Sequence, residues 1–224
     1  MQRTAFELVI FDCDGVLVDS ERVSNQVFAD MLGEIGVPVT LDYMFDNFMG
    51  HATPHCLALV ASLLGHAPPA DFATRYRART KQAFESDLRP IPGIAAALDA
   101  IKLPYCVASN GDHDKMRTTL GITGLLPRLE GKLFSATEVA RSKPAPDIFL
   151  HAARHYGIAP EACLVIEDSP VGATGAVAAG MTVFGYAAHT PGARLLEVGC
   201  ERVFSHMAEL PALLATGYAL NVPA

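Results

Sequence analysis

The chain has 224 residues, half of them hydrophobic, and a formal net charge of −7. This length allows one large domain or a domain with an inserted module, and the hydrophobic content supports a sizeable core. The acidic balance and the lack of any block of lysine or arginine argue against a nucleic-acid partner, because phosphate backbones are bound by clustered basic residues. No apolar run approaches the roughly 18 residues of a membrane span, so no membrane partner is expected.

The first residues of the sequence lead directly into an apolar run, so we expect no signal peptide. The five cysteines are scattered and odd in number, with neither a CxxC pair nor the spacing of zinc ligands. Disulfides are rare in reducing compartments. The cysteine pattern therefore predicts a reduced, cytoplasmic environment.

Short apolar runs that end in polar residues recur along the chain and predict β-strands. They lie at 8–12, 104–109, 132–135, 163–168, 181–186 and 202–204. Patterns typical of helices lie between them, at 94–101, 115–120, 147–156, 171–179 and 208–215. Strands that alternate with helices predict an α/β fold, with a Rossmann-like parallel sheet core covered by helices on both faces.

One region departs from this alternation. Between about residue 20 and residue 87 the apolar residues recur at spacings of three and four, in helical patterns at 23–35, 44–48, 54–64 and 71–84. We predict an all-helical cap domain over residues 18–87, inserted after the first strand, with residues 1–17 and 88–224 forming the catalytic core. A lid in this position would close over the strand ends and exclude water.

Two acids follow the first apolar run. Asp12 and Asp14 come directly after Leu8-Val9-Ile10-Phe11, and Gly15 breaks the pattern just behind them. A doubly wound sheet binds its ligand at the carboxyl ends of its strands. We therefore expect two carboxylates where chemistry occurs, at a spacing that lets one attack and the other carry a proton.

Polar residues also end two later strand-like runs, at Ser109-Asn110 and at Glu167-Asp168, and Lys143 lies in a loop before a helix. In a parallel sheet these ends converge on one edge. Clustered acids repel one another unless a cation shares the site, and oxygen ligands without cysteine or histidine favour Mg²⁺. A magnesium ion beside a hydroxyl and a lysine suits a phosphate dianion.

A carboxylate that attacks a phosphate dianion meets repulsion between two anions. Mg²⁺, Lys143, the Ser109 hydroxyl and loop N–H groups would offset that repulsion. We therefore expect Asp12 to form an aspartyl-phosphate. Asp14 is placed to protonate the leaving alkoxide and then to deprotonate the attacking water.

Four motifs occur along the chain in the same order as in the haloacid dehalogenase superfamily, and the chain resembles the branch of that superfamily that has a helical cap after the first strand. The first has the pattern DxDGxxxDS, the second is a strand ending in Ser or Thr, the third is a lysine before proline, and the fourth is an acidic pair. They are Asp12-Cys13-Asp14-Gly15-Val16-Leu17-Val18-Asp19-Ser20, Ala108-Ser109-Asn110-Gly111, Ser142-Lys143-Pro144 and Glu167-Asp168-Ser169.

The resemblance implies a nucleophile at Asp12 and a general acid–base at Asp14. It also implies Mg²⁺ held by the Asp12 side chain, the Asp14 backbone carbonyl and Asp168, with Glu167 assisting. The expected catalytic residues are then Asp12 and Asp14. The expected metal ligands are Asp12, Asp14, Asp168 and Glu167, and phosphate is expected to bind to Ser109, Asn110 and Lys143. True dehalogenases of the superfamily lack the second acid of the first motif, so Asp14 favours phosphoryl transfer.

The chain also resembles β-phosphoglucomutase-type enzymes, but with two departures. No histidine follows the first motif closely, and the stretch Phe48-Met49-Gly50-His51-Ala52-Thr53 contains no arginine. The turn Ser109-Asn110-Gly111 followed by Lys115-Met116 looks more like sugar-phosphate phosphatases of the 6-phosphogluconate type. We therefore predict a Mg²⁺-dependent phosphatase for a small phosphorylated metabolite, a sugar phosphate, with a phosphomutase as the alternative.

Substrate selection is expected from the cap. His51 and Thr53 lie near the Gly50 turn, and Arg75 and Arg79 lie on the last cap helix. A basic residue there could hold a carboxylate or a hydroxyl-rich sugar. The alternative is that these arginines belong to a solvated helix face.

A different class of protein, the receiver-like signalling domain, also combines an acidic cluster, Mg²⁺, a Ser or Thr and a lysine. It would make Asp12 a phosphorylation switch. The helical insertion and the second acid, Asp14, argue against that reading. We expect the protein to act as a monomer or a weak homodimer.

Overall fold

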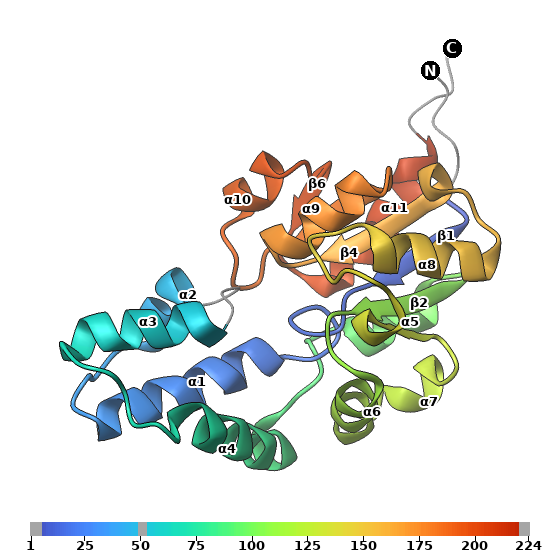
Figure 1. Cartoon of the computed structure of the whole chain (residues 1–224). Helices are drawn as coiled ribbons and strands as arrows, with labels where there is room; N and C mark the ends of the chain where they lie inside the picture. Colours follow the sequence, from blue (N-terminus) through green and yellow to red (C-terminus); the bar gives the residue numbers. More distant parts are fainter. Residues whose placement is uncertain (1–5, 49–52, 220–224) are drawn as a thin grey trace. The chain divides into compact units, whose positions relative to one another are not determined.

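The computed structural model describes residues 6–48 and 53–219. The chain divides into two compact units (Figure 1). The sheet unit combines the chain up to Val18 with the chain from Pro90 onward, and the helical unit runs from Asp19 to Arg89. These division points lie one and two residues beyond the predicted boundaries at 17/18 and 87/88. That the helical unit acts as a cap stays a prediction.

The sheet unit contains, within the described residues, a six-stranded sheet of order β3-β2-β1-β4-β5-β6 in which every neighbouring pair is parallel. The strands are β1 (Leu8–Phe11), β2 (Tyr105–Ser109), β3 (Leu133–Ser135), β4 (Cys163–Glu167), β5 (Thr182–Tyr186) and β6 (Arg202–Phe204). This is the order of a doubly wound fold: the chain builds outward from β1 to β3, then returns to start the other half at β4. The predicted Rossmann-like sheet is confirmed.

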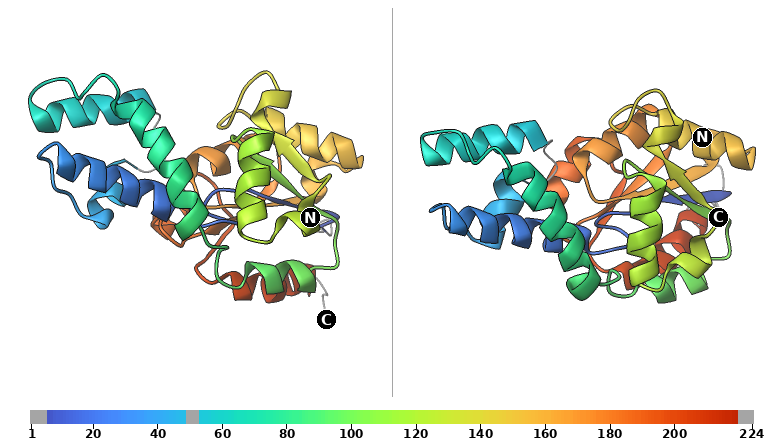
Figure 2. Two further views of the ribbon diagram at one scale, coloured as in Figure 1. Left: turned by 90° about the horizontal axis from the view of Figure 1, so that it is seen from below. Right: turned by 60° about the horizontal axis from the view of Figure 1, so that its bottom comes forward.

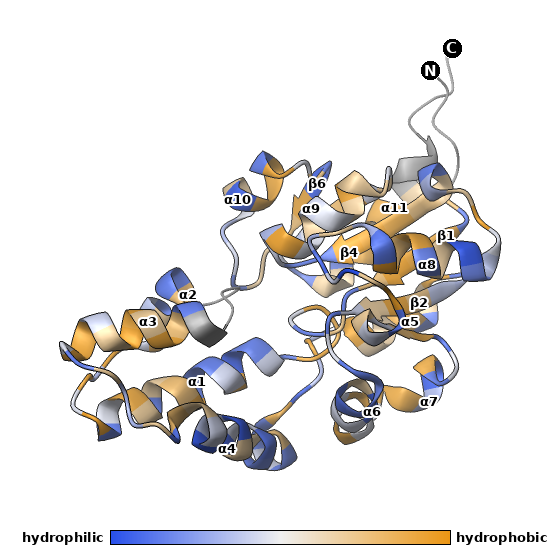
Figure 3. Cartoon of the chain, viewed as in Figure 1, coloured by the Kyte–Doolittle hydropathy of each residue, from blue (hydrophilic) through white to orange (hydrophobic). Residues whose placement is uncertain are grey.

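Strand β1 is apolar because it is covered on both faces. All four of its residues are fully buried, as are the five residues of β4, which is typical of a parallel sheet between two layers of helices. Figure 3 shows the hydrophobic character of these strands. The register pairs Phe11 with Ile166 on β4 and with Val107 on β2. The residues that follow these positions therefore emerge at the same edge of the sheet.

Helices cover both faces of the sheet, as predicted (Figure 2). On one face, α8 and α9 pack their apolar sides against β1, β2, β4 and β5 in a core that includes Ile10, Val165 and Phe149. On the other face, α5 and α11 lie together. The helices of this unit are α5 (Ile94–Ala100), α6 (His113–Ile122), α7 (Leu126–Leu129), α8 (Asp147–Tyr156), α9 (Pro170–Ala178), α10 (Gly192–Glu197) and α11 (Leu210–Ala219), with 3-10 turns at Ala136–Glu138, Pro160–Ala162 and Met207–Glu209.

The predicted helices of the sheet unit are present, and the structure adds two that the sequence pattern did not indicate. These are α7 and α10, of four and six residues. Helices are predicted from apolar residues that recur at spacings of three and four, and neither of these helices is long enough to repeat that spacing.

The described residues of the helical unit contain α1 (Ser20–Glu34), α2 (Leu41–Asn47), α3 (Thr53–Leu64) and α4 (Phe72–Asp87). They enclose a hydrophobic core of their own. At its centre the Phe28 ring lies 4.9–5.4 Å from the rings of Phe48, Phe72 and Tyr76, measured between centroids. The two chain segments that connect the units run antiparallel to each other, with a bridge between Val18 and Pro90.

None of the described helices is both long enough and apolar enough to pass through a membrane. All five cysteines are buried, and none forms a disulfide.

Replacement of Phe28 by alanine should lower the free energy of unfolding by about 3–5 kcal/mol, because it removes the ring at the centre of the helical unit's core. Urea denaturation followed by circular dichroism measures the change. Leu63→Ala, at a side chain that is 40% exposed, is the matched control and should change stability by less than about 0.5 kcal/mol. A Phe28→Ala loss below about 1 kcal/mol would contradict this account of the core.

Candidate active site

Three buried carboxylates gather at the carboxyl ends of the two central strands. Asp12 directly follows β1, while Glu167 ends β4 and Asp168 comes next in the chain. One oxygen from each of the three lies within 4.8 Å of the others. The register that pairs Phe11 with Ile166 produces this meeting, since it places the next residue of each strand side by side.

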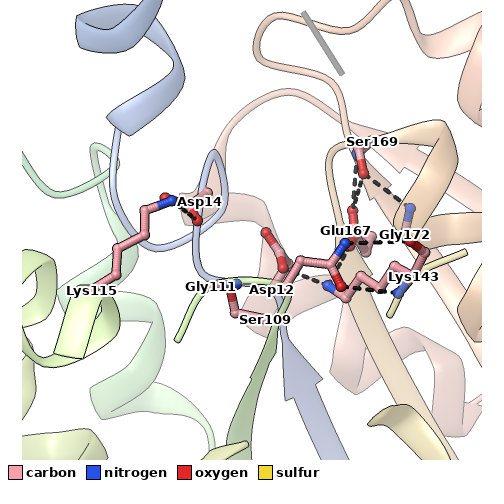
Figure 4. A network of polar contacts seen from close by, with 10 residues as sticks. Asp12, Asp14, Ser109, Gly111, Lys115, Lys143, Glu167, Ser169 and Gly172 are labelled. Carbon is pink, nitrogen blue, oxygen red and sulfur yellow. Dashed lines mark hydrogen bonds and ion pairs between the residues drawn. The ribbon is translucent and has the colours of Figure 1, made fainter. Parts of the chain in front are cut away.

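A buried lysine joins two of these acids. The Lys143 ammonium donates hydrogen bonds to Oδ1 of Asp12 at 2.5 Å and to Oε1 of Glu167 at 2.8 Å (Figure 4). The Nζ atom also lies 4.9 Å from the centre of the Phe149 ring. Burial by itself would lower the pKa of Lys143, but the two carboxylates outweigh burial and raise it. The lysine is therefore held in its charged form.

The loop that carries Lys143 is attached to the end of β2 by Asn110. Oδ1 of Asn110 accepts a hydrogen bond from the Lys143 backbone N–H at 2.9 Å, and Nδ2 donates to the Lys143 carbonyl at 3.4 Å. The Lys143–Pro144 peptide is cis. The side chain of Asn110 thus contacts the lysine loop, so its predicted role in binding phosphate stays a prediction while its role in holding Lys143 rests on two hydrogen bonds.

Glu167 uses both of its carboxylate oxygens within the protein. Oε1 accepts from Lys143, and Oε2 accepts from the backbone N–H and the hydroxyl of Ser169, each at 3.0 Å. The Ser169 hydroxyl in turn caps α9 by accepting from the Gly172 N–H at 3.1 Å. A Cβ atom on Gly172 would lie only 1.6 Å from Oε1 of Glu167. The first turn of α9 therefore forms a close-fitting wall for this acid.

A second glycine makes room for Asp168. Gly15 has a φ of +82°, and a Cβ atom there would lie 2.1 Å from Oδ2 of Asp168. Both the backbone conformation and the close approach require glycine. The glycine of the first motif therefore lets the loop after β1 pass directly over the Asp168 carboxylate.

Asp14 and Ser109 border the turn after β2. Ser109 is buried, and its hydroxyl accepts a hydrogen bond from the Gly111 N–H at 3.0 Å. Oδ2 of Asp14 accepts from the Lys115 ammonium at 2.8 Å. A Cβ atom on Gly111 would lie 3.3 Å from the Ser109 hydroxyl oxygen and 3.9 Å from Oδ2 of Asp14. The structure therefore places Lys115, which was not among the predicted site residues, in direct contact with one of them.

Burial dominates the electrostatics of Asp12. Burial, together with the nearby carboxylates of Glu167 and Asp14, raises the pKa of Asp12 to about 7, although the Lys143 ammonium acts in the opposite direction. Three clustered carboxylates against one ammonium leave an excess of negative charge. The three carboxylates offer hard oxygen ligands, so the cluster fits a divalent cation of the kind that binds oxygen, such as Mg²⁺ or Ca²⁺.

The predicted substrate residues of the cap fall into two groups. His51 lies outside the described residues, and Thr53 is the first residue of α3. Arg75 and Arg79 on α4 both form ion pairs with Glu34 on α1, at 3.2 Å for Arg75, and all three side chains are about 40% exposed. These exposed pairs favour the alternative of a solvated helix face, and a role in binding substrate stays a prediction.

Replacing Gly172 by alanine should lower the free energy of unfolding by about 1–3 kcal/mol, because the added methyl group would overlap the Glu167 carboxylate. Thermal denaturation at neutral pH measures the loss. Gly33→Ala on α1 is the control. Among the described residues, no heavy atom other than those of the adjoining residues and the helix's own backbone lies within 4 Å of a Cβ at Gly33, so stability should stay equal or rise by up to about 1 kcal/mol. An equally tolerated Gly172→Ala would show that the wall around Glu167 is not close-fitting.

The raised pKa of Asp12 predicts how stability depends on pH without divalent cations. The ionised form of Asp12 is disfavoured in the folded state. The contribution of neutral Asp12 to the free energy of unfolding is therefore fully present below about pH 4, and it is lost as pH rises through about 7. Asp12→Asn removes this dependence. In EDTA, the unfolding free energy of the variant minus that of the original chain should therefore grow by on the order of 1–4 kcal/mol between pH 4 and pH 8. If the difference between the two unfolding free energies stayed constant over this pH range, it would contradict the raised pKa of Asp12.

Comparisons with known proteins agree with this geometry. A model of the haloacid dehalogenase-like hydrolase family matches residues 6–180. The 6-phosphogluconate phosphatase of Escherichia coli (strain K12) is 34% identical over 208 residues, which cover 92% of this chain and 94% of that protein.

Two solved structures are similar over nearly the whole chain. A haloacid dehalogenase-like protein from Agrobacterium tumefaciens str. C58 has a TM-score of 0.90 at 37% identity, covering 95% of this chain and 99% of that one. A hydrolase of the same family from Deinococcus radiodurans R1, solved with bound phosphate and sodium, has a TM-score of 0.87 at 34% identity. The match covers 98% of this chain and 99% of that one. The parallel sheet, the buried acidic cluster and these matches establish that the chain belongs to the haloacid dehalogenase-like hydrolases.

Proposed function

We propose that the protein is a phosphatase that hydrolyses a small phosphorylated metabolite, a sugar phosphate, through an aspartyl-phosphate on Asp12. The observation that carries this proposal is the buried Lys143 ammonium held against Asp12 at the end of the central strand. A cation beside a carboxylate nucleophile is what an attack on an anionic phosphate requires. The phosphatase named among the relatives supports the same reaction.

The chemistry divides into two displacements at phosphorus. In the first, a carboxylate oxygen of Asp12 bonds to phosphorus while the bond from phosphorus to the sugar oxygen breaks, and Asp14 gives its proton to that leaving oxygen. In the second, a water oxygen bonds to phosphorus, Asp14 takes the proton from the water, and the bond between phosphorus and Asp12 breaks. The products are the free sugar and inorganic phosphate, and both acids return to their starting forms.

Lys143 and Ser109 provide the anion-binding side of the proposed site. Lys143 carries a fixed positive charge, and its ion pairs with Asp12 and Glu167 set its position. The Ser109 hydroxyl oxygen already accepts from Gly111, so we expect the hydroxyl to donate its own proton to a phosphate oxygen. Asn110 contributes by keeping the Lys143 loop attached to β2. Groups held in place before the substrate arrives need no rearrangement during the reaction.

We propose that Asp12 and Asp168 hold a divalent cation, Mg²⁺, with the Asp14 backbone carbonyl as a further ligand. The cation would supply positive charge that offsets the repulsion between the Asp12 carboxylate and the phosphate. Glu167 assists from a distance, since both of its oxygens accept hydrogen bonds from Lys143 and Ser169. The position of Asp168 depends in turn on the space left by Gly15.

A panel of phosphate esters tests the proposed function. The panel contains 6-phosphogluconate, hexose and hexitol phosphates, phosphoglycolate and nucleotides, and the readout is release of inorganic phosphate. Release should require Mg²⁺ after treatment with EDTA and should be fastest for a sugar phosphate. A parallel assay follows the isomerisation of β-glucose 1-phosphate. Isomerisation without net release would establish a phosphomutase, and a single phosphorylation of the protein without turnover would establish a receiver-like switch.

Asp12→Asn should lower the phosphatase rate by at least about 10³-fold, because it removes the attacking oxygen while leaving an amide that can still pair with Lys143. The measurement is kcat on the best substrate of the panel, with circular dichroism confirming the fold. Asp99→Asn is the matched control, since Asp99 is an exposed acid that pairs only with Arg128 among the ion pairs described. Appreciable turnover by Asp12→Asn would refute the covalent mechanism.

A further inference from the structure

Lys115 occupies a fixed place at the start of α6. It is the third residue of that helix, and its backbone N–H donates to the capping carboxylate of Asp112 at 2.7 Å. Its carbonyl accepts from the Thr119 hydroxyl at 3.0 Å. The backbone from which the lysine side chain extends is therefore held at both its N–H and its carbonyl.

The helix dipole disfavours a lysine at this position. A cation in the first turn faces the positive end of the helix dipole, which is unfavourable by a few tenths of a kcal/mol to about 1 kcal/mol. Arg117, two residues later, pairs with Glu130. Lys115 instead pairs with Asp14, 101 positions earlier in the chain. Residues that oppose a local preference are expected at functional sites.

The turn between Ser109 and α6 contains Gly111, and the side chain of Lys115 passes close to this glycine on its way to Asp14. A Cβ atom on Gly111 would lie 3.3 Å from Cδ of Lys115 and 3.9 Å from Oδ2 of Asp14. The lysine stem therefore passes closely over a residue that has no side chain. Figure 4 shows Lys115 extending to Asp14 from one side of the site and Lys143 extending to Asp12 from the other. Asp12 and Asp14 are thus each paired with a different lysine.

We propose that Lys115 is a positioning residue for Asp14, an inference that rests on the proposed phosphatase function. The ion pair engages Oδ2 of Asp14 and so restricts rotation of a carboxylate that is otherwise partly exposed. Asp14 is then held in one orientation from which it gives its proton to the leaving oxygen of the sugar. The lysine neither bonds to the substrate nor exchanges a proton in this scheme.

Two substrates that differ in their need for a general acid test this role. A sugar phosphate releases a strongly basic alkoxide that must be protonated, whereas p-nitrophenyl phosphate releases a stable phenolate. For Lys115→Met we expect kcat/KM to fall by about 30-fold or more on the sugar phosphate and by less than about 3-fold on p-nitrophenyl phosphate. Because kcat/KM covers only the steps through the first irreversible displacement, the later activation of water does not affect the comparison.

Three further variants complete the experiment. Lys115→Arg keeps the cation and should recover part of the loss on the sugar phosphate. Arg117→Met, on the same helix, should change neither substrate's kcat/KM by more than about 2-fold. Asp14→Asn should show the same selective loss as Lys115→Met, and a larger one. If Lys115→Met does not fold, Lys115→Gln takes its place in the same comparison.

Each remaining outcome has a definite meaning. An equal fall on both substrates would show that Lys115 binds the phosphate or the rest of the substrate, and would overturn the positioning role. No fall on either substrate would reduce the ion pair to a surface contact and overturn it as well. Both results leave the phosphatase function standing. An original chain that releases phosphate from neither substrate would overturn the proposed function and this inference together.

Discussion

The ion pair between the Lys143 ammonium and the carboxylates of Asp12 and Glu167 is the interaction on which the rest of the site depends. All three groups are buried, and an unpaired charge in their position would be strongly unfavourable. The pairing allows a carboxylate to stay at the end of the central strand, where it can reach a ligand. Asn110 and Ser169 belong to the same arrangement, because one holds the loop of the lysine and the other holds the second oxygen of Glu167.

Two glycines set the shape of this cluster through the atoms they lack. A side chain at Gly15 would overlap Asp168, and one at Gly172 would overlap Glu167. The loop after β1 and the first turn of α9 therefore approach the acids as closely as backbone can. Close packing of this kind keeps like charges near one another, and their repulsion adds to the effect of burial in raising the pKa of Asp12. A cation in the cluster would offset that repulsion.

Asp12 and Asp14 lie in different surroundings, although only one residue separates them in the chain. Asp12 is buried and paired with a buried lysine, whereas Asp14 is partly exposed and paired with a lysine that is 44% exposed. A nucleophile benefits from a rigid, dry position, and a group that must exchange protons with leaving oxygen and water benefits from contact with solvent. The proposed division of roles follows these surroundings, with Lys143 serving the first acid and Lys115 serving the second.

The order of apolar runs and their polar ends was enough to predict the parallel sheet, its helices and the residues at the strand ends, because burial on both faces imposes a recognisable pattern on each strand. Short helices such as α7 lacked that pattern. Tertiary structure alone decided which atoms meet: the register of β1 and β4 brings Asp12 to Glu167, and the turn at Gly111 brings Lys115 to Asp14. Such partners lie 101 or more positions apart in the chain, and no spacing along a chain encodes a contact that depends on how distant strands and helices pack.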